Sequence, residues 1–212
     1  MEKTTIKETK PFEYLVERRY KNYTTIIIAA IIASLTMFLM LMFFFTVYFF
    51  QTKAEGLALP KLFFLSTGII LFSSYFLQET KHAFLKDNIE EVKKNALITL
   101  LFGIGFLLCQ IIAWWMMLEG LNHEKSANES IKILVYFMAF LHFLHAFAGI
   151  VFWSIFTFQM HERLIDFHIS PLYFTDPIVK SKLILFTLFW HFVDILWLVL
   201  FLFFLFFQYF AI

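Results

Sequence analysis

The polar side chains best suited to chemistry lie in two long apolar segments near the C-terminus. One segment contains His142 and His145, and the other contains His191 and Asp194. Each pair is spaced three residues apart, which places both members on one face of a helix. Imidazole and carboxyl groups can bind metals, pass protons or hydrogen-bond to one another. Because a carboxylate at the centre of a bilayer costs at least about 2.5–3.5 kcal/mol, we expect Asp194 to face the protein and not the lipid.

The elements that must position these residues are membrane-spanning helices. The chain has 212 residues, of which 61% are hydrophobic, whereas soluble domains are about 45–50% apolar. Five apolar runs reach the length of about 17–25 residues that a transmembrane helix needs, and they cover 25–50, 58–78, 96–118, 132–158 and 183–207. Backbone groups in hydrocarbon must bond within their own segment. We therefore predict an all-α integral membrane protein with five transmembrane helices in a single domain, 1–212.

The charged residues predict how the chain crosses the membrane. Most of its 17 Lys and Arg residues lie in the N-terminal segment and in the loops 79–95 and 159–182. Cytoplasmic loops carry an excess of Lys and Arg, so we expect the N-terminus in the cytoplasm and the C-terminus outside. The net charge of +1 argues against nucleic acid as a partner.

The two polar pairs are expected to lie at similar depth. At about 1.5 Å per residue, His145 and Asp194 lie near the midplane, with His142 and His191 within about 6 Å of it. The two spans are consecutive and antiparallel, and Gly149 would allow close helix approach. We predict that they pack together through one polar cluster formed by His142, His145, His191 and Asp194.

The residues alone leave three roles open for this cluster. It could be a structural contact between helices, since such polar contacts are worth about 0.6 kcal/mol on average. It could have a proton or lipid-headgroup role, or it could bind a metal or haem, for which His145 and His191 are the pair closest in depth. No HExxH motif and no Cys/His set with metal spacing occurs, so we predict no metal site.

Four segments resemble subunit III of the haem-copper oxidases, which include cytochrome c oxidase and quinol oxidases. Residues 190–197, WHFVDILW, resemble that family's W-H-F-x-D-x-x-W signature, and His142, His145 and Gly149 match its H-x-x-H-x-x-x-G pattern. Two weaker matches lie upstream, in GIGFLLCQIIAWW (103–115) and ASLTMF (33–38). Five spans are similar to the short bacterial form, which lacks the first two of seven helices.

The resemblance implies an accessory subunit without an active site or redox centre of its own. Haem and copper would belong to subunits I and II. The partners implied are mainly subunit I, then subunit II, small subunits or a larger respiratory assembly, and structural phospholipid. The complex would pass electrons to O₂ and pump protons in the bacterial cytoplasmic (inner) membrane, with this chain supporting subunit I stability, lipid binding and proton uptake.

Two positions depart from the family's pattern. Leu35 and Ala113 stand where many members have glutamate, which weakens the case for a proton-related role of the first three spans. Gln110 is expected to hydrogen-bond between helices. Arg163, His161 and His168 in the inner loop are candidates for contact with anionic lipid headgroups.

Two other functional classes compete with the oxidase subunit. The first is a small membrane b-type cytochrome, which would retain haem when this chain is purified alone. The second is a proton-coupled transporter that uses Asp194. Transporters often contain inverted repeats and broken helices, and the absence of both signals from the sequence counts against this class.

Overall fold

Five long helices make up the part of the chain that the computed structural model describes, residues 11–52, 59–123, 129–163 and 174–210. The helices are α1 (Pro11–Thr52), α2 (Leu62–Leu85), α3 (Ile89–His123), α4 (Glu129–Arg163) and α6 (Pro177–Phe210). Each contains a stretch long and apolar enough to cross a membrane. The predicted all-α fold with five spanning helices is therefore confirmed.

The helices α2 and α3 are joined by a much tighter connection than the predicted loop 79–95. Helix α2 continues to Leu85 and α3 begins at Ile89. In between, the backbone N–H groups of Lys86 and Asn88 donate to Ala83 O at 3.2 and 3.0 Å, and Asp87 has φ 55°. The expected charged loop is therefore mostly helical. The three residues between the helices supply N–H donors for the last carbonyl groups of α2, so no longer loop is needed.

Helix α6 also begins earlier than the predicted span. Its first residue is Pro177, whose missing N–H costs nothing at that position. Asp176 caps the helix, since its Oδ1 accepts a hydrogen bond from Ile178 N at 2.8 Å and its carbonyl accepts one from Lys180 N at 3.2 Å. The part of the predicted loop 159–182 after Pro177 is therefore helical.

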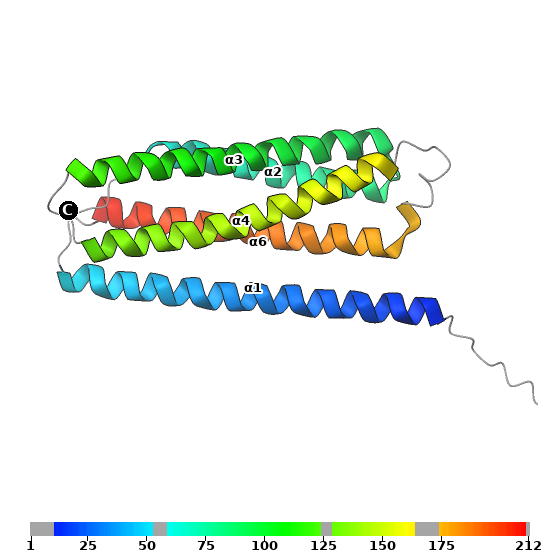
Figure 1. The fold of residues 1–212 in the computed structure, drawn as a ribbon, viewed down its shortest axis with the longest axis horizontal. Coiled ribbons are helices and arrows are strands. Elements are labelled where there is room, and N and C mark those ends of the chain that lie inside the picture. Colours follow the sequence, from blue (N-terminus) through cyan, green and yellow to red (C-terminus); the bar gives the residue numbers. More distant parts are fainter. Residues whose placement is uncertain (1–10, 53–58, 124–128, 164–173, 211–212) are drawn as a thin grey trace, which may run out of the picture.

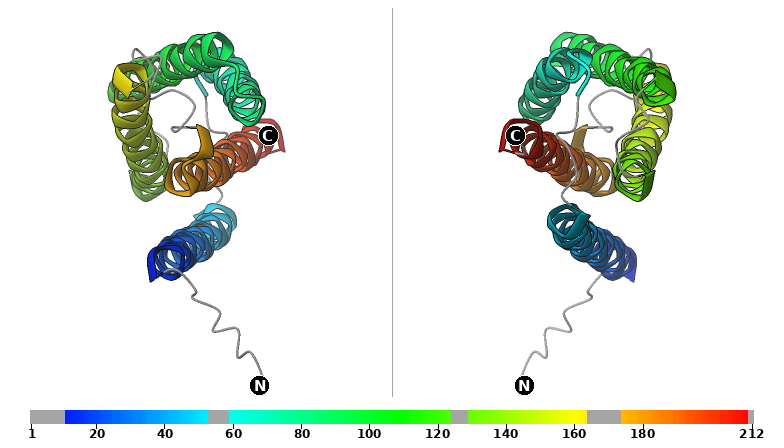
Figure 2. Two further views of the ribbon diagram at one scale, coloured as in Figure 1. Left: turned by 90° about the vertical axis from the view of Figure 1, so that its right-hand side faces the viewer. Right: turned by 90° about the vertical axis from the view of Figure 1, so that its left-hand side faces the viewer.

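Four of the helices form a ring, and the fifth lies outside it. Viewed along the long axis, α2, α3, α4 and α6 occupy the four sides of a square, with α1 beside α4 and α6 (Figure 2). Inside the ring the largest fully buried side chains include Trp153, Trp190, Trp197 and Phe106. The indole Nε1 of Trp153 donates to Ala96 O at 3.1 Å, which ties α4 to α3.

The two ends of the molecule differ in charge. The start of α1, the α2–α3 connection, the end of α4 and the start of α6 lie at the same end, on the right in Figure 1. We call it the basic end, because it carries Lys81, Lys86, Lys93, Lys94, Arg163, Lys180 and Lys182. The positive-inside rule predicts that the basic end faces the cytoplasm.

Candidate functional site: polar groups within the helix bundle

His142 lies in the centre of the ring. Its side chain is 1% exposed, and its imidazole packs against Phe106 at 6.0 Å and Trp197 at 5.1 Å between ring centroids. Neither ring nitrogen has a hydrogen-bond partner within the described ranges. This histidine therefore packs as an aromatic ring between α3 and α6.

His145 faces α1 and not α6. Its Nδ1 lies 2.6 Å from Leu141 O, and because a carbonyl can only accept, Nδ1 carries the proton. Nε2 is then the acceptor for the Ser34 hydroxyl group, 3.0 Å away on α1. The ring also meets the edge of Phe38, with centroids 5.9 Å apart. His145 thus uses both nitrogens, one to fix its own orientation and one to hold α1.

His191 and Asp194 face α2. The Nδ1 atom of His191 lies 2.6 Å from the Ser74 hydroxyl oxygen and 4.0 Å from Asp194 Oδ2. The Asp194 side chain is 5% exposed, and neither carboxyl oxygen has a well-aligned hydrogen bond in the described residues. Ser74 lies beside this carboxyl group.

The combination of serine, histidine and aspartate is not a hydrolytic triad. In a triad, serine and aspartate bind opposite nitrogens of the imidazole, so that a proton can cross the ring. Here Ser74 and Asp194 both approach Nδ1 of His191. The arrangement allows a proton to be shared between hydroxyl and carboxyl groups on one side of the ring.

The four residues of the predicted polar cluster have different partners in the structure. The structure distributes its members among the ring interior (His142), the contact with α1 (His145) and the contact with α2 (His191 and Asp194). The physical reason is that two serines on other helices offer hydroxyl groups at the same depth. A polar group in hydrocarbon bonds to whichever partner is nearest, and it need not be on the consecutive helix.

The close contact between α4 and α6 is made by a glycine and a tryptophan. A Cβ atom on Gly149 would lie 2.9 Å from Trp190 Cζ3 and 3.2 Å from Phe189 Cε1. On α3, a Cβ atom on Gly103 would lie 3.4 Å from the same indole and 3.3 Å from Ile150 Cγ1. The indole of Trp190 fills the space between the two glycines, so Gly149 stands where close packing requires it.

Gln110 makes a buried bond between two helices. Its Nε2 donates to the Ser66 hydroxyl oxygen on α2 at 3.1 Å, and Ser66 in turn donates to Phe63 O at 3.0 Å.

The two positions where this chain departs from the family's pattern differ in environment. Leu35 is 45% exposed on α1, whereas Ala113 is fully buried in the ring.

Two of the three headgroup candidates lie at the basic end of the described structure. His161 and Arg163 are exposed at the end of α4, and His168 lies outside the described residues. His161 lines a groove of about 850 Å³ between α3 and α4, with Lys93 and Lys94 at its polar end and Leu97 and Phe158 among its apolar walls.

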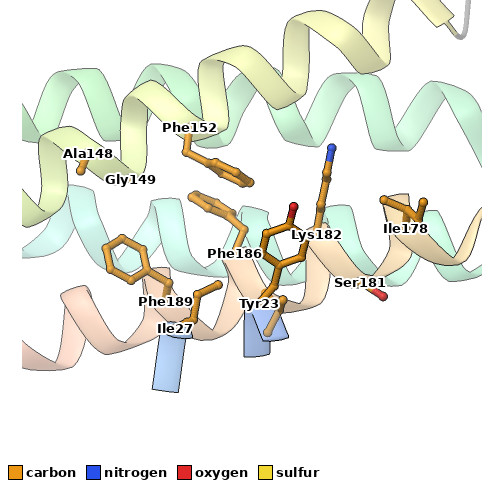
Figure 3. Close-up of a pocket in the computed structure, with 11 residues that line it drawn as sticks. Tyr23, Ile27, Ala148, Gly149, Phe152, Ile178, Ser181, Lys182, Phe186 and Phe189 are labelled. Carbon is orange, nitrogen blue, oxygen red and sulfur yellow. The ribbon is translucent and has the colours of Figure 1, made fainter. Parts of the chain in front are cut away.

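A second cavity separates α1 from the ring. It has a volume of about 410 Å³ and is lined by α1, α4 and α6. Phe152, Phe186 and Phe189 form its aromatic walls, with Tyr23 and Lys182 on the side of the basic end (Figure 3). The rings of Phe152 and Phe186 stack 5.5 Å apart.

Sequence reasoning did not assign roles to Ser34 and Ser74, although these two serines decide where His145 and His191 bind. A signal was present, because both are polar residues in the middle of apolar spans. Serine is common in membrane helices for packing reasons, so its presence alone does not identify a partner.

Comparison with known proteins shows a consistent set of relatives. The chain is 28% identical to cytochrome bo(3) ubiquinol oxidase subunit 3 of Buchnera aphidicola subsp. Schizaphis graminum over 141 residues, 66% of this chain and 68% of the relative. It is 29% identical to the subunit of the same name from Pseudomonas putida, over 49% of this chain and 44% of the relative. It is 26% identical to quinol oxidase subunit 3 of Bacillus spizizenii, over 74% of both chains.

No family model matches the sequence. The relatives nevertheless carry the name that the motifs in 142–149 and 190–197 indicated, and those motifs lie on adjacent helices of the ring. The resemblance to subunit III of the haem-copper oxidases is therefore confirmed, and quinol oxidase subunit 3 is the form to which this chain is similar.

Proposed function

We propose that this chain is the accessory subunit III of a proton-pumping haem-copper oxidase in the respiratory chain of a bacterium. It would cross the cytoplasmic membrane five times with its basic end inside, and it would support the stability and proton uptake of subunit I. The observation that carries the proposal is the match to subunit 3 of quinol oxidases over up to 74% of the chain.

The proposed electron donor of the complex is quinol. The resemblance to the haem-copper oxidases left both cytochrome c and quinol open as the donor, and the relatives reported above are named ubiquinol or quinol oxidase subunits. The donor site itself would lie in another subunit, as would the haem and copper.

The hydrogen bonds of the histidines support a structural role for this chain. An axial haem ligand must present a free nitrogen to the iron, whereas both nitrogens of His145 are engaged, with Leu141 and Ser34. His191 bonds to a serine on a different helix. The two histidines proposed as a haem pair therefore serve contacts in different directions, and the described residues contain no group of three potential metal ligands.

The cavity between α1 and the ring is the proposed site of a structural phospholipid. Its walls are aromatic and aliphatic, which suits an acyl chain, and the Lys182 amine near the membrane surface suits a phosphate. The groove at Lys93, Lys94 and His161 has the same combination of apolar walls and cationic rim and would hold a second headgroup.

Purification through a tag on this chain in mild detergent tests the proposal. We expect oxidase subunits I and II to co-purify and the preparation to show a haem Soret band, whereas the chain expressed without those subunits should show none. Haem retained by the chain alone, and lost in His145→Ala, would instead identify a b-type cytochrome.

The control variant for this experiment is Thr36→Ala. The Thr36 hydroxyl group bonds to Ile32 O within its own helix and is exposed, so its loss should leave the co-purifying chains unchanged. If neither oxidase subunits nor haem accompany the tagged chain, and substrate uptake is found in liposomes that contain it, a transporter replaces the oxidase subunit as the explanation.

A further inference from the structure

A line of polar side chains follows one face of α2 from the basic end toward the middle of the membrane. His82, Gln78 and Ser74 are spaced four residues apart, so they lie above one another on that face. Gln78 Nε2 lies 3.3 Å from His82 Nε2, and the Ser74 hydroxyl oxygen lies 2.6 Å from His191 Nδ1. From Ser74 the line passes to His191 on α6 and ends at Asp194, whose Oδ2 lies 4.0 Å from His191 Nδ1.

We propose that Asp194 is a proton-exchanging carboxylic acid, supplied from the basic end through this line of side chains. This role goes beyond the proposed function, which gives His191 a hydrogen bond to another helix and assigns no role to Asp194. It also does not depend on which electron donor or which oxidase the chain serves.

The burial of Asp194 explains why such a route matters. Its side chain is 5% exposed and neither oxygen has a well-aligned partner in the described part of the chain. An ionised carboxylate there would lack the hydrogen bonds that normally compensate for burial. An intramembrane acid of this kind is expected to be functional and to exchange its proton through a neighbouring group.

Ser74 provides the exchange step. When His191 carries protons on both nitrogens and Asp194 is ionised, the Nδ1 proton of His191 passes to the Ser74 oxygen. At the same time the Ser74 hydroxyl proton passes to the carboxylate. The products are a neutral imidazole and a neutral carboxylic acid, so the atoms and charges balance, and the reverse step returns the proton.

The surrounding charges favour movement of the proton toward the carboxylate. Lys81, on the same helix as Ser74, lies close enough to His191 to act on its charge. A positive imidazolium is unfavourable beside this ammonium group, and transfer to Asp194 removes that positive charge. Besides His191 and Asp194 themselves, both on α6, the titratable group that acts on this pair from α2 in the described residues is Lys81.

Access from the basic end is provided by the outer members of the line. His82 is exposed at the end of α2, and Gln78 is partly buried one turn further in. The step from Gln78 to Ser74 spans one helical turn, a separation that a bridging water molecule can cover.

Infrared difference spectroscopy of the complex in native membranes tests this proposal. The wild-type spectrum minus that of Asp194→Asn should contain the C=O band of one protonated carboxyl group, and this band should shift when H₂O is replaced by D₂O. In Ser74→Ala we expect the D₂O shift to appear about fivefold more slowly, the factor that corresponds to the net free energy of one typical hydrogen bond.

Ser73→Ala is the matched control, because its hydroxyl group is buried on the same helix but donates to Thr99 O on α3 at 3.1 Å. In Ser73→Ala the Asp194 carboxyl proton should exchange at the wild-type rate. Gln78→Leu provides a second interruption that leaves Ser74 and His191 intact, and it should also slow the exchange. The proposal is overturned if the Asp194 difference band is absent, or if Ser74→Ala and Gln78→Leu both exchange as fast as Ser73→Ala.

Discussion

The four-helix ring and α1 are built from similar apolar residues but differ in how much of their surface the protein itself covers. In the ring helices, 33–44% of the most apolar stretch is buried, whereas in α1 only 6% is. The ring closes around large side chains that fit against glycines, such as Trp190 between Gly103 and Gly149. Helix α1 is held along one edge and otherwise faces outward (Figure 2).

The difference shows that hydrophobicity alone does not assemble helices in a membrane. Lipid tails are as apolar as leucine side chains, so helices associate through close packing and hydrogen bonds. In the described residues, hydrogen bonds join α2 to α3, α3 to α4 and α2 to α6, for example Gln110 to Ser66, Trp153 to Ala96 and Trp197 to Thr67. Helices α4 and α6 meet through the close contact of Gly149 with Trp190. Helix α1 depends on a histidine, a group of phenyl rings and whatever occupies the cavity beside it.

The largest expected effect is on the ring. Gly149→Val should destabilise it by about 3 kcal/mol, at the upper end of the cost of overpacking, because even a Cβ atom would lie 2.9 Å from Trp190. Unfolding in mixed micelles, followed by tryptophan fluorescence, measures this change. Gly68→Ala is the control, since its Cβ would meet nothing within 4 Å. Equal stability of the two variants would show that the glycine contact does not hold the ring together.

A smaller effect is expected where α1 joins α6. Phe45 makes edge contacts with Phe203 and Phe207, with ring centroids 5.4 and 5.1 Å apart. Phe45→Leu should therefore weaken the docking of α1 by about 1 kcal/mol while the ring remains folded. Spin labels on Tyr23→Cys and Ser181→Cys, with Cys109→Ala, would report a broader distance distribution between α1 and α6.

The control for this variant is Phe43→Leu on the outer side of α1. Phe43 is 64% exposed, so its replacement should leave the distance distribution as in the wild type. A broadening of similar size in both variants would mean that the phenyl contacts with α6 are not what holds α1.

The cavity between the two regions should bind anionic lipid through Lys182. We expect Lys182→Gln to lower the amount of anionic phospholipid that remains bound after purification about fivefold, corresponding to about 1 kcal/mol for one lysine near the membrane surface. Native mass spectrometry counts the retained lipids. Lys180→Gln is the control, because Lys180 is exposed and does not line the cavity; equal loss in both variants would rule out a specific contact.

The smallest effect is expected from the bond between Ser34 and His145. Ser34→Ala removes a single interhelical hydrogen bond of 3.0 Å, and such bonds are worth about 0.6 kcal/mol on average in membranes. The same spin labels should show a slight broadening, with Thr36→Ala unchanged. A complete loss of α1 docking would show that this bond matters more than the phenyl contacts do.

Several features of this protein follow from the order of its residues alone. The lengths of the apolar runs determine that there are five spanning helices, because the thickness of a bilayer sets the length of the helix that crosses it. The positions of Lys and Arg likewise predict which end faces the cytoplasm. The motifs at 142–149 and 190–197 were enough to indicate the family. All three are properties that can be counted along the chain.

The partner of each polar group was decided only by the tertiary structure. His145 bonds to Ser34, 111 residues away, and His191 bonds to Ser74, 117 residues away, so both histidines hydrogen-bond to helices that are distant in the sequence. Depth in the membrane follows from residue number, but the rotation of a helix about its axis depends on how side chains such as Trp190 fit against Gly149 and Gly103. That fit involves three helices at once, and no single segment of the sequence contains it.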